Sequence, residues 1–99
     1  MIKISYKKDK LISEVKISGH ASFAEFGKDI VCAAVSTLVT TTINNILTLD
    51  NEAIKYVDKD GYILITNEGS ELADKLLNNM IEMLNELASD YPKNINIGG

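Results

Sequence analysis

The start of the chain alternates between apolar and polar side chains in two short runs. A period of two is typical of strands with one buried face. The charged segment 7–10 separates the runs and favours a turn, so the two strands are expected to form a hairpin. The positions that share one parity are Ile2, Ile4 and Tyr6 in the first run, and Leu11, Ser13, Val15 and Ile17 in the second.

The period changes to that of a helix from Asp29 to about Leu49. Asp29 suits the start of this helix, as an N-cap or as an acid in the first turn. Apolar side chains at helical spacing predict one face turned to the core. The stripe consists of Val31, Val35, Leu38, Thr42, Ile46 and Leu49, widened by Val39 and Ile43.

The second half of the chain repeats this outline. Residues 53–58 and 62–66 read as strands joined by the tight-turn dipeptide Asp60-Gly61. A helix follows over roughly residues 69–89, and Pro92 ends it. Its wide apolar face is formed by Leu72, Leu76, Leu77, Met80, Ile81, Leu84, Leu87 and Ala88.

The order ββαββα predicts an α+β two-layer sandwich, with a mainly antiparallel sheet under two long helices. Ile95 and Ile97 alternate with asparagines, which allows a short C-terminal strand. With 99 residues, the chain suits a single domain over residues 1–99. A chain of this size buries about two-thirds of its unfolded surface, so an oligomer interface would add useful burial.

Charge and composition narrow the possible partners. The net charge of -4 argues against binding nucleic acid, which needs a surplus of Lys and Arg. One cysteine and one histidine leave no intramolecular disulfide and no thiolate cluster for zinc, so neither a metal nor another cofactor is expected.

The chain also shows no clear membrane or export signal. The N-terminal segment 1–10 lacks the apolar stretch of a signal peptide, and the longest apolar run, 30–35, is too short to span a bilayer. We therefore expect a cytoplasmic protein, because a lone thiol stays reduced there.

The only histidine and the only cysteine form the most informative pair. His20 falls in an irregular loop over residues 19–28, and Cys32 falls in the first turn of the helix. The partial positive charge and unpaired N–H groups of a helix N-terminus stabilise a thiolate, and they could stabilise an oxyanion too. An imidazole nearby can take the thiol proton and return it to a leaving amine.

Structural explanations exist for the same residues. A lone cysteine often packs as a small hydrophobe, and Cys32 lies toward the apolar stripe of its helix. A loop histidine is usually a solvated side chain, and Ser36 could bond back to the helix backbone. Phe23 and Phe26 could line a substrate groove or simply pin the loop to the core.

Two motifs carry a family resemblance. Gly19-His20-Ala21, followed by the block from Asp29 to Ser36 with Cys32 inside it, resembles the ribosomal-processing cysteine protease (Prp) family. The opening strands, the long helices and the Tyr91-Pro92 ending extend this similarity over nearly the whole chain. The resemblance implies a cysteine endopeptidase that removes a short N-terminal extension from a protein of the large ribosomal subunit, cutting after apolar and aromatic residues.

The resemblance also implies roles for single residues. Cys32 matches the catalytic nucleophile, and His20 matches the general base and acid. Asp29 and Ser36 match supporting residues, as does Gly19 in the histidine motif. Members of the family are dimeric, so a homodimer is expected. The alternatives are a non-enzymatic ribosome-associated binding protein, in which Cys32 belongs to the core, and a redox-sensing thiol, which would need a resolving cysteine from outside the chain.

Overall fold

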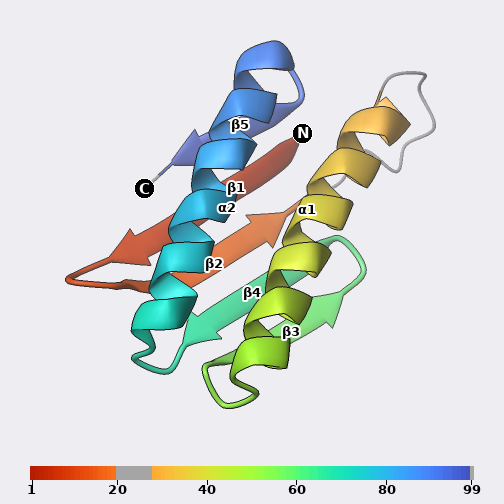
Figure 1. Cartoon of the computed structure of the whole chain (residues 1–99). Helices are drawn as coiled ribbons and strands as arrows, with labels where there is room; N and C mark the ends of the chain where they lie inside the picture. Colours follow the sequence, from red (N-terminus) through yellow and green to blue (C-terminus); the bar gives the residue numbers. More distant parts are fainter. Residues whose placement is uncertain (20–27, 99) are drawn as a thin grey trace.

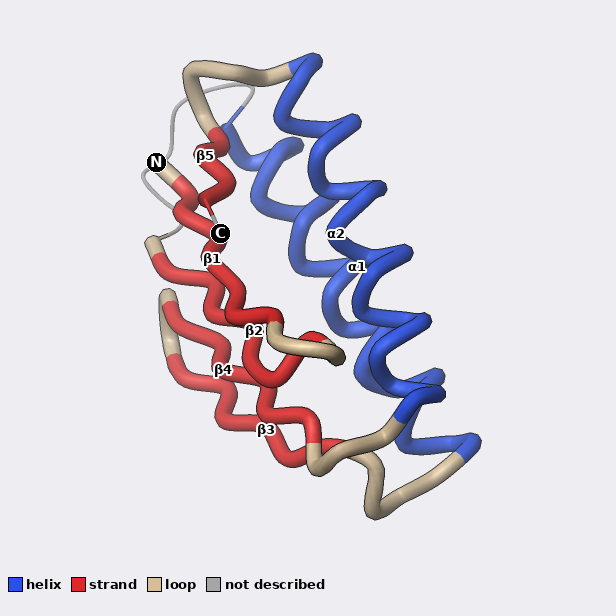
Figure 2. Tube along the Cα trace, turned by 90° about the vertical axis from the view of Figure 1, so that its left-hand side faces the viewer, coloured by secondary structure: helices blue, strands red, loops and turns tan. Residues whose placement is uncertain are grey.

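The computed structural model describes residues 1–19 and 28–98. A five-stranded sheet forms one layer, and two helices cover one of its faces (Figures 1 and 2). The elements in chain order are β1 (Ile2–Lys8), β2 (Ile12–Ser18), α1 (Lys28–Leu49), β3 (Ile54–Lys59), β4 (Tyr62–Asn67), α2 (Glu71–Asp90) and β5 (Ile95–Gly98). The predicted α+β sandwich is confirmed, and the optional C-terminal strand is present.

The sheet is mixed, with the strand order β3-β4-β2-β1-β5. β1 pairs antiparallel with β2, and β4 pairs antiparallel with both β2 and β3. The short β5 lies parallel to β1, with Ile95 beside Ile2 and Ile97 beside Ile4. Since β4 inserts next to β2, the two ββα halves of the chain share one continuous sheet.

The predicted hairpin is present, but the parity expected for its second strand is wrong at the start. The register of β1 and β2 shifts between Lys7 and Lys8. An extra residue in one strand moves the neighbouring side chains to the other face. Ile12 is therefore buried while Leu11 is half-buried, although Val15 and Ile17 occupy the core as expected.

α1 presents its apolar stripe to the sheet. Val31, Val35, Val39, Ile43 and Ile46 are buried, whereas Leu49 at the end of the helix is exposed. By length and composition the segment Ile30–Leu49 would also be long and apolar enough to cross a membrane. Its inner residues belong to the core of the sandwich, which accounts for the apolar stripe on that side, and threonines and asparagines are exposed on its outer side.

α2 has a sharply defined start. The hydroxyl of Ser70 accepts a hydrogen bond from the backbone N–H of Ala73, so Ser70 is the N-cap and the helix begins two residues later than Gly69. The position of this start determines which residues of α2 face the core. Ala73 lies in the core, while Leu72, expected on the apolar face, is partly exposed.

Candidate active site

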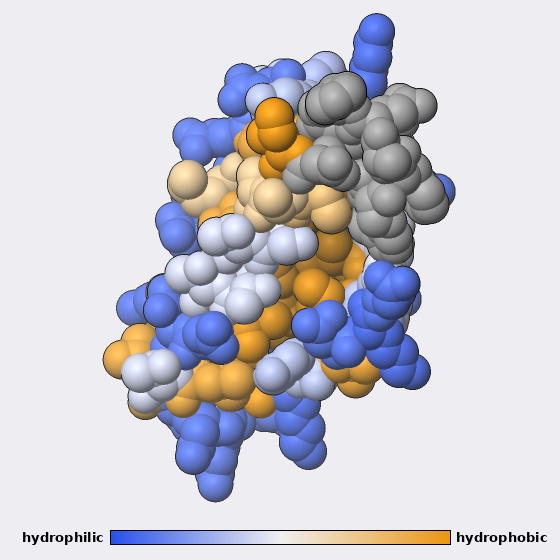
Figure 3. All heavy atoms as spheres, turned by 90° about the vertical axis from the view of Figure 1, so that its right-hand side faces the viewer, coloured by the Kyte–Doolittle hydropathy of each residue, from blue (hydrophilic) through white to orange (hydrophobic). Residues whose placement is uncertain are grey.

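A cavity of about 410 Å³ lies between the N-terminal half of α1 and one end of the sheet. Figure 3 shows its apolar floor between the paler surface of α1 and a hydrophilic group of side chains. Several chain segments meet here: the start of β1, the end of β2, and the turn from β3 to β4. The lining residues are Ile2, Ile17, Gly19, Cys32, Val35, Ser36, Val39, Asp58, Lys59, Asp60, Gly61, Tyr62 and Ile63.

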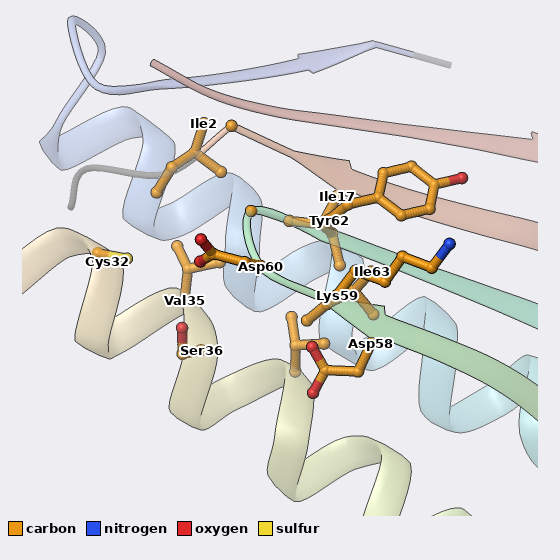
Figure 4. Close-up of a pocket in the computed structure, with 13 residues that line it drawn as sticks. Ile2, Ile17, Cys32, Val35, Ser36, Asp58, Lys59, Asp60, Tyr62 and Ile63 are labelled. Carbon is orange, nitrogen blue, oxygen red and sulfur yellow. The ribbon is translucent and has the colours of Figure 1, made fainter. Parts of the chain in front are cut away.

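Cys32 opens into this cavity from α1. Its side chain is partly exposed and packs against the hydrophobic core. Ser36 follows one helical turn later and lines the same cavity, because residues four apart share a helix face (Figure 4). Within the described residues, neither the thiol of Cys32 nor the hydroxyl of Ser36 makes a hydrogen bond, so both groups are available to a ligand.

Gly19 fixes the end of β2 beside the cavity. Its backbone N–H donates to the carbonyl of Gly61 at 3.0 Å, which ties β2 to the β3–β4 turn. Its φ is 73°, in the region that favours glycine, and a Cβ at this position would collide with the carbonyl oxygen of Met1. No other residue fits here without a shift of the backbone, so Gly19 holds the point where the chain leaves β2.

The wall opposite α1 was not anticipated from the sequence. It comes from the end of β3 and the following turn, and the carboxylate of Asp60 points from this turn toward α1 (Figure 4). Asp58 and Lys59 complete the polar rim, while Ile17 and Ile63 belong to the apolar floor. The Asp60-Gly61 dipeptide was recognisable as a turn, but its place opposite Cys32 depends on the pairing of β4 with β2.

The structure brings some of the predicted site residues together and leaves others untested. Cys32, Ser36 and Gly19 line one cavity. His20, Phe23 and Phe26 lie outside the described residues. The backbone of Asp29 belongs to the first turn of α1, which agrees with a position at the helix start, but its side chain is outside the description.

This arrangement fits an acyl-transfer site. The cavity is open to solvent, has an apolar floor, and contains the thiol of the fifth residue of α1, just after the first turn in which the sequence predicted it. The alternative in which Cys32 is sealed in the core disagrees with its partial exposure. Within residues 1–19 and 28–98, no group of three or more His, Cys, Asp or Glu side chains is arranged to hold a metal ion.

Comparisons with known proteins agree with this chemistry. The family model described as cysteine protease Prp matches residues 1–96. A ribosomal processing cysteine protease Prp from Bacillus subtilis is 31% identical over 97 residues, which cover 90% of this chain and 87% of that protein.

Two crystal structures of the essential ribosomal processing protease Prp from S. aureus share the whole fold. The complex with a substrate peptide has a TM-score of 0.90 at 26% identity, covering 99% of this chain and 98% of the other. The complex with a covalently linked product peptide has a TM-score of 0.88 at 27% identity, with the same coverage. The protein described here therefore belongs to the cysteine protease Prp family and is itself a cysteine protease.

Proposed function

We propose that this protease removes the short N-terminal extension of a protein of the large ribosomal subunit. The observation that carries the proposal is a partly exposed Cys32 in an open cavity, in a chain that shares its fold with a ribosomal processing protease. That relative was crystallised with a substrate peptide and with a covalently linked product peptide. The net charge of -4 favours encounter with a basic protein, as ribosomal proteins commonly are.

In the proposed reaction, Cys32 is the nucleophile and His20 is the general base and acid. His20 takes the proton of the thiol, and the sulfur attacks the carbonyl carbon of the scissile bond. N–H groups near the start of α1 stabilise the oxyanion. His20 then donates its proton to the leaving amine, which yields an acyl-enzyme, and water attacks the thioester to release the extension and restore the thiol.

The supporting residues have narrower proposed roles. Ser36, on the same helix face as Cys32, offers a hydroxyl to the bound peptide. Gly19 fixes the backbone immediately before His20, which limits where the imidazole can reach. Asp29 either orients His20 or helps the helix to begin, and Phe23 and Phe26 contact apolar residues of the extension.

The test uses the extended ribosomal protein itself. The purified chain and its Cys32→Ala variant are each incubated with the precursor, and the product masses are measured. The unaltered chain should yield two fragments separated at one bond. The Cys32→Ala variant should lose on the order of 10⁴-fold in rate, since removing a nucleophile leaves little catalysis. Turnover within tenfold of the unaltered chain would remove Cys32 from the mechanism.

We also propose a homodimer. The outer side of α1 has no charged residue from Ile30 to Leu49, and with α2 it forms a shallow groove of about 600 Å³. Such a neutral face lets two acidic chains meet without bringing like charges together. The groove is lined by Ala33, Ala34, Thr37, Leu38, Thr41, Met83 and Leu87. Light scattering should show a dimer that Thr37→Lys disrupts, and a monomer at all concentrations would exclude it.

A cytoplasmic location is the remaining part of the proposal. Ribosomal proteins are assembled in the cytoplasm, and the reducing conditions there keep the lone thiol of Cys32 available for chemistry. Cell fractionation should recover the protein with the soluble ribosomal fraction. Recovery with the membrane fraction would contradict a cytoplasmic location.

A further inference from the structure

β3 is an edge strand with an unusual surface. It is the first strand in the sheet order, and among the described residues no strand pairs with its outer side. Only Ile54 is buried along its length. Tyr56 is 48% exposed and Val57 is 41% exposed, although apolar side chains on a free edge invite unwanted pairing. Such an edge is a template for another extended chain.

The register shows which backbone groups of β3 are available. The N–H of Glu68 donates to the carbonyl of Ala53 at 2.9 Å, so residue 53 faces β4. Hydrogen-bonded positions alternate along an antiparallel pair, which places 55, 57 and 59 on the β4 side as well. Ile54, Tyr56 and Asp58 therefore direct their N–H and C=O groups away from β4.

The same strand leads into the cavity of Cys32. Asp58 and Lys59, at the end of β3, line that cavity together with Cys32 and Ser36. Side chains alternate between faces, so Tyr56 shares the helix-covered face with buried Ile54 and cavity-lining Asp58. A peptide extended from the cavity along β3 would meet a polar rim first, then Tyr56, with backbone groups within reach at every second residue.

We propose that the peptide substrate binds as an added strand along the free edge of β3, with its scissile bond at Cys32. This inference rests on the proposed function and adds the binding mode. Backbone hydrogen bonds to Tyr56 and Asp58 hold the segment on one side of the scissile bond in an extended form, as in other cases of strand addition. Tyr56 packs against apolar side chains of the peptide, which explains its exposure in the free protein.

A peptide is a better occupant of this edge than a second copy of the chain. Pairing of β3 with β3 of another copy would cover the mouth of the cavity, since Asp58 and Lys59 belong to both. The side chain of Lys55 lies on the opposite face of the sheet from Tyr56. Its ammonium group there lies 3.3 Å from a carboxylate oxygen of Glu68. The continuity of the edge with the cavity is the observation that favours the substrate.

The main experiment scans the backbone of the substrate. The probe is a synthetic peptide spanning the extension and the cleavage junction of the ribosomal precursor, N-methylated at one residue at a time. Strand addition predicts that kcat/KM falls about five- to tenfold at every second residue on one side of the scissile bond, and little in between. Losses without this period of two would overturn the inference.

A matched pair of protein variants isolates the contribution of Tyr56. Tyr56→Pro removes the outward N–H and Tyr56→Ala removes the side chain, while a proline on the open side of an edge strand leaves the β4 pairing intact. Tyr56→Pro should lower kcat/KM about fivefold below Tyr56→Ala, at an unchanged rate of Cys32 alkylation by iodoacetamide. Equal kcat/KM for the two variants would contradict strand addition.

Hydrogen exchange of backbone amides tests the same binding mode without any substitution in β3. In the Cys32→Ala variant, saturating peptide should slow exchange of the Tyr56 and Asp58 amides, while slow exchange at Val57 persists with or without peptide. Unchanged exchange at Tyr56 and Asp58, with cleavage of the peptide by the unaltered chain, would overturn strand addition and leave the proposed function standing. No cleavage by the unaltered chain would overturn both.

Discussion

The polar side chains around the start of α2 are hydrogen-bonded to other parts of the protein, whereas the thiol of Cys32 at the cavity has no such bond within the described part of the chain. Near α2, the amide of buried Asn67 donates to the carbonyls of Ile12 and Ser70 and accepts from the N–H of Ser70. Asp74 accepts from the N–H of Ile12 and from Asn78. At the cavity, by contrast, the thiol of Cys32 makes no hydrogen bond to any described residue.

This difference separates the side chains that stabilise the fold from the thiol that takes part in the reaction. Around α2, side chains satisfy backbone groups that would otherwise be buried and unpaired, which holds the β2, β4 and α2 ends together. Around Cys32, the backbone N–H of Gly19 donates to the carbonyl of Gly61, while the thiol of Cys32 and the hydroxyl of Ser36 make no hydrogen bond within the described residues. Removing a polar side chain from the first region should therefore lower stability, and removing the thiol of Cys32 or the hydroxyl of Ser36 should lower activity.

The largest effect of this kind is expected at Asn67. Asn67→Ala removes three hydrogen bonds in a buried position and should lower the free energy of unfolding by about 2 to 4 kcal/mol. Urea denaturation measures the loss. Asn79→Ala, on the exposed side of α2, is the control and should change stability by less than about 0.5 kcal/mol. Equal stability of the two variants would contradict a structural role for the Asn67 network.

A pair of glycines tests how the backbone supports the cavity. Gly69 has a φ of 88° with nothing near the place of a Cβ, so Gly69→Ala should cost about 1 kcal/mol of stability and no activity. Gly19→Ala meets the Met1 carbonyl as well and should cost about 2 to 3 kcal/mol. It should also lower kcat/KM, because His20 follows directly. Thermal unfolding and cleavage assays compare the two variants. Equal changes in stability and in kcat/KM would mean that the contact with Met1 is unimportant.

The smallest effects come from a pair of serines. Ser70→Ala removes the N-cap of α2 and should cost about 1 kcal/mol of stability at unchanged kcat/KM. Ser36→Ala should leave stability within about 0.5 kcal/mol and lower kcat/KM about fivefold, because Ser36 lines the cavity in which we propose that the substrate binds. If Ser36→Ala lowered stability and left kcat/KM unchanged, Ser36 would have a structural role only.

The local periodicity of the sequence was enough to predict the elements, since alternation and helical stripes are properties of short segments. It failed where a register shift moved Ile12 into the core and where Ser70 set the start of α2. Of the site residues that the motifs predicted, Cys32, Ser36 and Gly19 line the cavity, while the side chains of His20 and Asp29 lie outside the described residues. The wall formed by Asp58 to Tyr62 could not be found in this way, because it reaches Cys32 only through long-range strand pairing.

The central claim is that the thiol of Cys32 attacks the substrate. The most direct test is to stop turnover of the ribosomal precursor with acid within the first cycle and to measure the mass of the enzyme and of its tryptic peptides. The account predicts a transient adduct of the extension on the peptide that contains Cys32, absent from a folded Cys32→Ala variant. Continued cleavage by Cys32→Ala, or an adduct on another residue, would contradict it.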